Sequence, residues 1–186
     1  MSAMKRVLVA STKGGVGKST VAALIARGLQ ARGEQVGALD LDVHGPTLAY
    51  ALGLTTAPLL GLDTAGEVIL PSDAGGIRLV TLASHWGEGT RVTWRGEAKL
   101  VLARELLQAA IDWGNCSWLV VDSPPSQGEE LQAILEDLPQ LHGAIIVSQP
   151  SDFSAADCDR LVDLFRDVGA PVYGVVSNME GCECPA

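Results

Sequence analysis

Short apolar runs alternate along the chain with longer stretches in which apolar residues recur at helical spacing. The runs, rich in valine and isoleucine, predict buried strands at residues 6–11, 34–42, 117–125, 142–150 and 171–178. The periodic stretches predict amphipathic helices at residues 19–33, 96–114 and 154–169. Residues 53–76 are rich in Gly, Thr, Pro and Asp and predict an irregular excursion, in which EVILP and IRLVTLA could pair as a hairpin across SDAGG. Strands that alternate with helices and are apolar throughout predict an α/β fold, a doubly wound, mainly parallel sheet with helices on both faces.

The segment STKGGVGKST, residues 11–20, joins the first predicted strand to the first predicted helix. Glycines let backbone N–H groups converge on an anion, and the N-terminal end of the helix carries partial positive charge. We therefore predict a phosphate cradle in which Lys18 reaches the terminal phosphates and Ser19 binds Mg²⁺. Its expected nucleotide-binding residues are Gly14, Gly15, Val16, Gly17, Lys18, Ser19 and Thr20. The strict pattern G-x-x-x-x-G-K-S/T has glycine where Thr12 stands, and Lys13 adds a second lysine.

Polar residues end three other predicted strands, at the edge where ligands bind in a doubly wound sheet. Asp40 and Asp42 are alternate residues, so their side chains can face the same side of the strand. One carboxylate could then support the magnesium shell and the other could position an attacking water. Alternatively, both residues could belong to a solvated turn. Asp122 stands where a carboxylate would hold Mg²⁺ through water. Asn178 offers a donor and an acceptor suited to an adenine edge, and it could equally be a plain strand-end residue.

Charge and composition narrow the function further. The net charge is −9 and no cluster of Lys or Arg is visible, which argues against binding of nucleic acid or anionic membrane. No apolar run reaches the ~18 residues of a membrane span, and no signal core precedes the first strand, so we expect a cytoplasmic protein. Of the four cysteines, Cys116 and Cys158 are expected to be small buried hydrophobes.

These motifs together resemble one family. KGGVGKST is similar to the deviant Walker A loop of the MinD/ParA-type ATPases, in which the lysine beside the glycine pair is the signature lysine. DLDVHGPT, VTWRGEAKL, VVDSPPSQGEE and GVVSNMEGCECP resemble the switch I, W-R-G, switch II and N-M–cysteine segments of the Mrp/ApbC branch. The similarity runs from about Lys5 to the end of the chain.

The resemblance implies an ATPase that acts as a nucleotide-dependent homodimer and delivers iron–sulfur clusters to client apoproteins. In that interpretation Lys13 crosses the dimer interface to the partner's nucleotide, and Asp42 positions the attacking water. Asp122 is the Walker B acid, and Asp40 also lies near Mg²⁺. Asn178 contacts adenine. Cys182 and Cys184 would bind the cluster, because two thiolates per protomer give the four that a bridging 4Fe–4S cluster needs. The alternative is a pair of free thiols on a frayed terminus.

The chain also departs from the family pattern. Ser126 and Gln127 replace glycine and threonine of switch II, which predicts altered and slow hydrolysis, and Glu97 replaces the proline of W-R-G-P. The family continues well past Ala186, so we expect a shortened chain or a naturally minimal version, organised as one ATPase domain over residues 1–186 with a cysteine-bearing tail from about residue 179. Two other functions share the loop: a ParA/MinD-type partition or positioning ATPase, and a nucleotide-binding regulator with weak hydrolysis. A kinase or synthetase is less well supported, because no motif for an acceptor substrate is visible.

Overall fold

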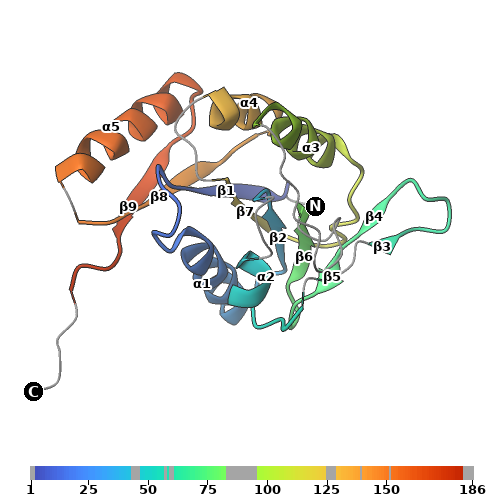
Figure 1. The fold of residues 1–186 in the computed structure, drawn as a ribbon. Helices are drawn as coiled ribbons and strands as arrows, with labels where there is room; N and C mark the ends of the chain where they lie inside the picture. Colours follow the sequence, from blue (N-terminus) through green and yellow to red (C-terminus); the bar gives the residue numbers. More distant parts are fainter. Residues whose placement is uncertain are drawn as a thin grey trace, which may run out of the picture.

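The described residues form a seven-stranded sheet with helices on both faces in the computed structural model (Figure 1). The structure describes residues 3–42, 47–56, 58, 61–82, 96–124, 129–138, 140–150 and 152–181. The strands are β1 (Lys5–Ala10), β2 (Val36–Asp40), β3 (Gly61–Leu62), β4 (Ile69–Leu70), β5 (Ser72–Asp73), β6 (Arg78–Thr81), β7 (Trp118–Asp122), β8 (Gly143–Ser148) and β9 (Val172–Ser177). The helices are α1 (Lys18–Ala31), α2 (Thr47–Ala51), α3 (Gly96–Gln108), α4 (Glu129–Asp137) and α5 (Asp152–Asp167).

The strand order is β5-β6-β2-β7-β1-β8-β9. After β6, at one side of the sheet, the chain returns to place β7 between β2 and β1, and then continues to β8 and β9 on the other side. Every neighbouring pair in this sheet is parallel except β5 with β6. The carboxyl ends of β1, β2 and β7 therefore meet at one edge of the sheet, with Val9 and Asp40 each in register with Asp122. The predicted fold class is confirmed.

Two hydrophobic cores lie on opposite faces of the sheet. Along β1, the side chain of Leu8 joins one core, whereas Val7 and Val9 join the other, as expected for alternate residues of a strand. The core around Leu8 includes apolar residues of α3, α4 and α5, and the core around Val7 includes those of α1 and α2. Figure 1 shows these two helical layers above and below the sheet. Burial on both faces explains why the central strands are apolar throughout.

Two predicted elements differ from the structure. EVILP does not pair with IRLVTLA: Ile69 and Leu70 pair with residues 61–62 in a separate two-stranded ladder, while β6 takes β5 as its antiparallel neighbour. The helix predicted to reach residue 114 ends at Gln108. Beyond it, Ile69 donates its N–H to the Ala110 carbonyl and accepts the Asp112 N–H, at 2.8 and 3.0 Å. This backbone pairing replaces the last predicted helical turn.

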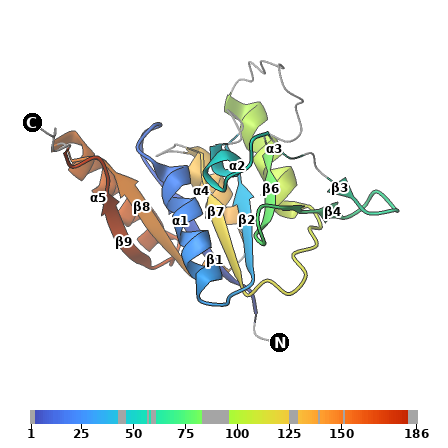
Figure 2. The same ribbon diagram turned by 90° about the horizontal axis from the view of Figure 1, so that it is seen from below.

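Two helices, α2 and α4, were not predicted. Figure 2 shows the β3–β4 ladder projecting at one end of the molecule, with β9 and α5 at the other end. No helix within the described ranges is long and apolar enough to span a membrane.

Candidate functional site

The glycine-rich segment forms the turn between β1 and α1. Gly15 and Gly17 adopt positive φ angles of 78° and 93°, which favour glycine over any residue with a Cβ. Gly17 is the N-cap of α1 and makes no side-chain capping bond, while its carbonyl accepts the Val21 N–H at 2.9 Å. The hydroxyl of Ser11 donates to the Lys13 carbonyl at 3.0 Å and holds the start of the turn. The loop thus presents the amino end of α1 at the carboxyl edge of the sheet, as the sequence predicts.

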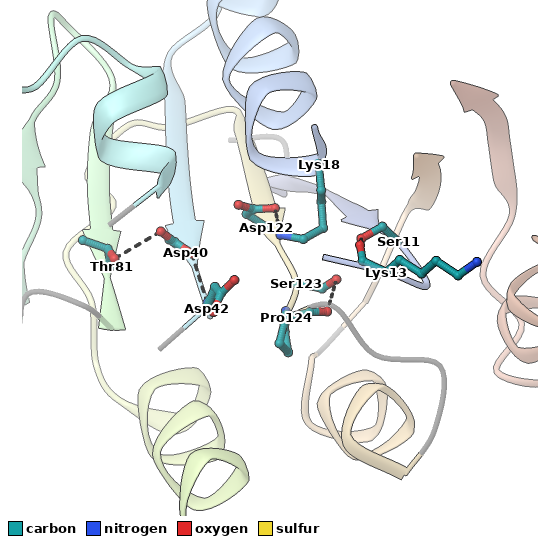
Figure 3. A network of polar contacts seen from close by, with 9 residues as sticks. All are labelled: Ser11, Lys13, Lys18, Asp40, Asp42, Thr81, Asp122, Ser123 and Pro124. Carbon is teal, nitrogen blue, oxygen red and sulfur yellow. Dashed lines mark hydrogen bonds and ion pairs between the residues drawn. The ribbon is translucent and has the colours of Figure 1, made fainter. Parts of the chain in front are cut away.

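Lys18 forms a buried ion pair with Asp122 at the end of β7. The Lys18 Nζ lies 2.5 Å from Asp122 Oδ1, and the two side chains are 7% and 0% exposed. The second carboxylate oxygen of Asp122, Oδ2, is buried and makes no hydrogen bond to the described residues. Burial raises the pKa of Asp122, and the charge and hydrogen bond of Lys18, together with a hydrogen bond from the Ser19 side chain, oppose this effect. The pair in Figure 3 therefore joins the phosphate loop directly to the strand that carries the predicted Walker B acid.

Asp40 lies beside Asp122 and is fully buried at the end of β2. Its Oδ1 accepts the backbone N–H of Asp42 at 3.0 Å, and its Oδ2 accepts the Thr81 hydroxyl at 3.2 Å. Burial and the negative charge of Asp122 raise the pKa of Asp40 well above its usual range. The hydrogen bond from the Asp42 N–H and the positive charge of Lys18 lower this pKa, but their effect is smaller. Both oxygens of Asp40 are thus engaged within the protein, and one of them fixes the backbone at Asp42 (Figure 3).

A magnesium ion fits this edge on the chemistry of the donors. Asp122 Oδ2 is a buried carboxylate oxygen without a hydrogen-bond partner among the described residues, and Ser19, only 7% exposed, lies in the first turn of α1. Among the described residues no group of three His, Cys, Asp or Glu side chains could hold a metal ion. Mg²⁺ typically uses one or two protein ligands and completes its shell with phosphate and water. The donor set therefore suits a nucleotide-bound Mg²⁺ better than a metal held by protein alone.

Lys13 points away from the buried carboxylates (Figure 3). Its side chain is 49% exposed, and its Nζ lies 3.5 Å from Asp157 Oδ2 on α5. The structure therefore separates the two lysines of the loop: Lys18 points into the sheet edge and Lys13 lies on the surface.

Asn178 follows β9 and contacts the phosphate loop. Its Nδ2 donates to the Val16 carbonyl at 2.9 Å, and its N–H donates to the Ser148 carbonyl at 2.8 Å. A Cβ on Gly17 would lie 2.3 Å from Asn178 Nδ2, so glycine is needed there for this approach as well as for its φ angle. The side chain predicted to contact adenine thus lies beside the loop that would hold the phosphates.

Several predicted features lie outside the described residues, namely Cys182, Cys184, Ser126 and Gln127. Glu97 is the second residue of α3, and its side chain is not described. Cys116 and Cys158 are free and only partly buried; Cys158 packs against the core around Leu8, and burial raises the pKa of Cys116.

Sequence reasoning missed Thr81 and Asp157 as site residues. Thr81 ends a strand next to β2, and the strand-end argument used for the aspartates could have found it. No sequence signal singles out Asp157, which lies on a helix with several other acidic residues.

Comparisons with known proteins agree with this geometry. A family model described as "NUBPL iron-transfer P-loop NTPase", of the ParA group, matches residues 2–186. The iron–sulfur cluster carrier protein of Deinococcus radiodurans is 40% identical over 175 residues, covering 93% of this chain and 48% of the relative. That of Methanocaldococcus jannaschii is 34% identical over 188 residues, covering 100% and 63%. The chain thus spans about half to two thirds of the length of these curated relatives.

Solved structures give the same fold. The nucleotide-binding protein from Archaeoglobus fulgidus, in complex with ADP, superposes with a TM-score of 0.78 at 30% identity, covering 97% of this chain and 69% of that one. The MinC:MinD complex of Aquifex aeolicus gives a TM-score of 0.58 at 22% identity over 93% and 68% of the chains, a likeness of fold alone. The predicted family resemblance is confirmed: this chain belongs to the NUBPL-type iron-transfer family of P-loop NTPases, whose curated relatives are iron–sulfur cluster carrier proteins.

Proposed function

We propose that this protein binds and slowly hydrolyses ATP with Mg²⁺ and works as a nucleotide-dependent homodimer that carries iron–sulfur clusters to client apoproteins. The observation that carries the proposal is the buried ion pair between Lys18 and Asp122, which places a cation and a half-satisfied carboxylate at the amino end of α1. Each member of the pair has an alternative partner in a bound Mg·nucleotide. The Lys18 ammonium group would donate to a phosphate oxygen, and the Asp122 carboxylate would face Mg²⁺.

In the proposed binding step, Lys18 Nζ leaves Asp122 and donates to the terminal phosphates of ATP, while the N–H groups of residues 14–20 bind the remaining phosphate oxygens. Ser19 and Asp122 would then hold Mg²⁺, Asp122 through water. When bound, Mg²⁺ neutralises charge on the phosphates. Because the metal would replace Lys18 as the cation near Asp122, the charge of this carboxylate would remain compensated in the buried site.

The proposed hydrolytic water is oriented by Asp42. The backbone N–H of Asp42 is fixed by a hydrogen bond to one carboxylate oxygen of Asp40. The other oxygen of Asp40 accepts the Thr81 hydroxyl, and the pKa of Asp40 is raised. We therefore propose two roles for Asp40: it positions Asp42, and it lies near the coordination shell of the metal. Asn178 would exchange the Val16 carbonyl for the adenine edge, since its amide offers both a donor and an acceptor.

Lys13 carries the proposal of a homodimer. It is half-exposed and its ion pair with Asp157 lies at the surface of α5, so it can exchange Asp157, whose side chain is 14% exposed, for the phosphates of a nucleotide held by the second protomer, in the manner of an arginine finger supplied in trans. Cys182 and Cys184 of both protomers would then supply the four thiolates of a bridging 4Fe–4S cluster. The protein would act as a single domain in the cytoplasm, with these cysteines on the tail beyond about residue 179.

The proposal is tested by anaerobic reconstitution with iron and sulfide. The chain should acquire a brown chromophore with about four irons per dimer, and Cys182→Ser with Cys184→Ser should abolish it. The matched control, Cys116→Ser with Cys158→Ser, should retain the chromophore, because Cys116 lies in the turn before β7 and Cys158 lies on α5. Equal iron binding by the two double variants would remove the assigned cluster site.

The ATPase part has its own test. Phosphate release should require Mg²⁺ and should fall in Lys13→Ala without loss of ATP binding, because Lys13 acts on the partner's nucleotide. Binding of Mg·ATP without phosphate release would support a nucleotide-binding regulator instead. A salt-dependent shift of DNA in the presence of ATP would support a partition ATPase.

A further inference from the structure

A cavity of about 190 Å³ lies under the last turn of α3, on the face of the sheet opposite α1. Four leucines that line it are at most 5% exposed: Leu39 of β2, Leu106 of α3, Leu119 of β7 and Leu138 after α4. The other lining residues are partly exposed, so the cavity reaches the surface. Because a dry cavity of about 150 Å³ holds benzene, this one has room for a small organic molecule.

One wall of the cavity is formed by the segment that follows α3 and is held by the rest of the fold. Trp113 lies on this segment, and a Cβ on Gly37 would lie only 2.7 Å from the nearest atom of its ring. Glycine inside a strand typically marks such a close approach, and β2 is buried along its whole length. The backbone of Ile69 binds Ala110 and Asp112 of the same segment. The wall therefore keeps its position without a ligand.

Arg6 is the only charged residue among the described residues that line the cavity. It precedes Leu8 by two positions in β1, so its side chain faces the same side of the sheet as that buried leucine. Its backbone N–H donates to His142 Nδ1 at 3.1 Å, and its carbonyl accepts the His142 N–H at 2.9 Å. Its guanidinium group, in contrast, makes no hydrogen bond or ion pair with any residue that the structure describes. A cation without an anion thus stands at an otherwise apolar cavity.

We propose that the cavity binds a small monocarboxylate with an apolar body, and that Arg6 holds the carboxylate. A guanidinium group can donate two parallel hydrogen bonds to a carboxylate, and the leucines and Trp113 would bury the body. No described lining residue is acidic, so none repels the anion. A dicarboxylate would place its second charge among apolar side chains without a partner. The site is independent of the proposed nucleotide site, because the phosphate loop follows the opposite end of β1.

The test compares octanoate with 1-octanol, which has the same apolar body and no charge. Isothermal titration calorimetry should show one octanoate per chain. In Arg6→Gln the affinity for octanoate should fall at least about tenfold, whereas the affinity for octanol should change less than about twofold. The matched control is Arg32→Gln, at the exposed end of α1, and it should bind both ligands as the parent does.

A second variant tests the cavity without altering Arg6. Ala109 lines the cavity after α3, and Ala109→Phe should fill it and abolish binding of both ligands. A parent that does not bind octanoate overturns the proposal. Equal weakening of octanoate and octanol in Arg6→Gln also overturns it, because the arginine would then only cover apolar surface with its stem. Octanoate binding that survives Ala109→Phe, or that Mg·ADP abolishes, would place the ligand elsewhere and overturn the assigned site.

Discussion

The strands β7 and β9 belong to the same sheet, yet they have opposite environments. In β7, Leu119 to Asp122 are all buried, and the strand is paired on both sides. In β9, every residue after Val172 is exposed, including Tyr173, Val175 and Val176, and β8 is its single neighbour in the described sheet. The predicted acid Asp122 therefore stands on a strand fixed by the core, whereas Asn178 and the cysteines follow a strand fixed by one ladder.

The two strands differ in how firmly the surrounding protein holds them in place. A buried strand between two cores can hold a charged pair in one geometry, because any displacement exposes an unpaired charge to apolar surroundings. An edge strand with few buried contacts opens at low free-energy cost. The candidate nucleotide site is thus built on a strand fixed between two cores, whereas Asn178 is held by its contacts with Ser148 and Val16.

The largest effect should follow from removing the cation of the buried pair. Lys18→Met leaves Asp122 buried and unpaired, so the free energy of unfolding should fall by about 3–5 kcal/mol. Adding Asp122→Asn should restore most of this loss, because the unpaired charge is removed with its partner. Urea unfolding of the single and double variants measures both, and a single variant as stable as the parent would show that the pair is not buried in solution.

A matched pair of valines compares β8 with β9 directly. Val147 and Val176 are in register, but Val147 is 1% exposed and Val176 is 36% exposed. Val147→Ala should cost about 2 kcal/mol, as for other core truncations, and Val176→Ala less than about 0.5 kcal/mol. Equal losses in chemical denaturation would indicate that β9 is covered in solution.

Asp40→Asn should stabilise the protein at neutral pH. Because the pKa of Asp40 is raised in the native state, the native protein keeps this proton to higher pH than the unfolded chain does. The stability contributed by Asp40 therefore falls as pH rises from its ordinary pKa of about 3.9 towards the raised native value, and is constant above that value.

The variant should accordingly gain about 1–3 kcal/mol at pH 7, and the gain should vanish below about pH 3. Asparagine can still accept the Asp42 N–H and can donate to Thr81, so the hydrogen bonds are kept. A variant less stable than the parent across the whole pH range would contradict this account of Asp40.

The smallest effect on stability is expected at the surface pair. Asp157→Asn weakens its 3.5 Å contacts with Lys13 and Arg160, which are 49% and 71% exposed, and should change the free energy of unfolding by no more than about 0.5 kcal/mol. It should nevertheless favour the Mg·ATP dimer, because Lys13 no longer has to leave a local anion. Sedimentation velocity would reveal this, and an unchanged monomer fraction would count against the role of Lys13 across the interface.

The sequence was most informative where one local rule decides the structure. Apolar runs located β1, β2, β7, β8 and β9, and the strand-end rule brought Asp40 and Asp122 to one edge. The run IRLVTLA also contains β6, but the sequence did not predict β3, β4 and β5, because strands of two residues carry almost no periodicity and their pairing cannot be read from it.

The contacts of the candidate site were harder to foresee. The Lys13–Asp157 and Gln149–Met179 contacts join residues far apart in the chain. No pattern in the sequence around these four residues indicates which side chain each of them contacts. The pairing of Lys18 with Asp122 also follows only once β1 and β7 are known to be neighbours.

The most direct test of the central claim is a crystal structure of the chain with Mg·ADP. The account predicts the diphosphate at the amino end of α1, with Lys18 Nζ moved from Asp122 Oδ1 to a phosphate oxygen and Asp122 facing the metal's water shell. A nucleotide bound elsewhere, or one bound at the loop while Lys18 and Asp122 remain paired at 2.5 Å, would contradict it.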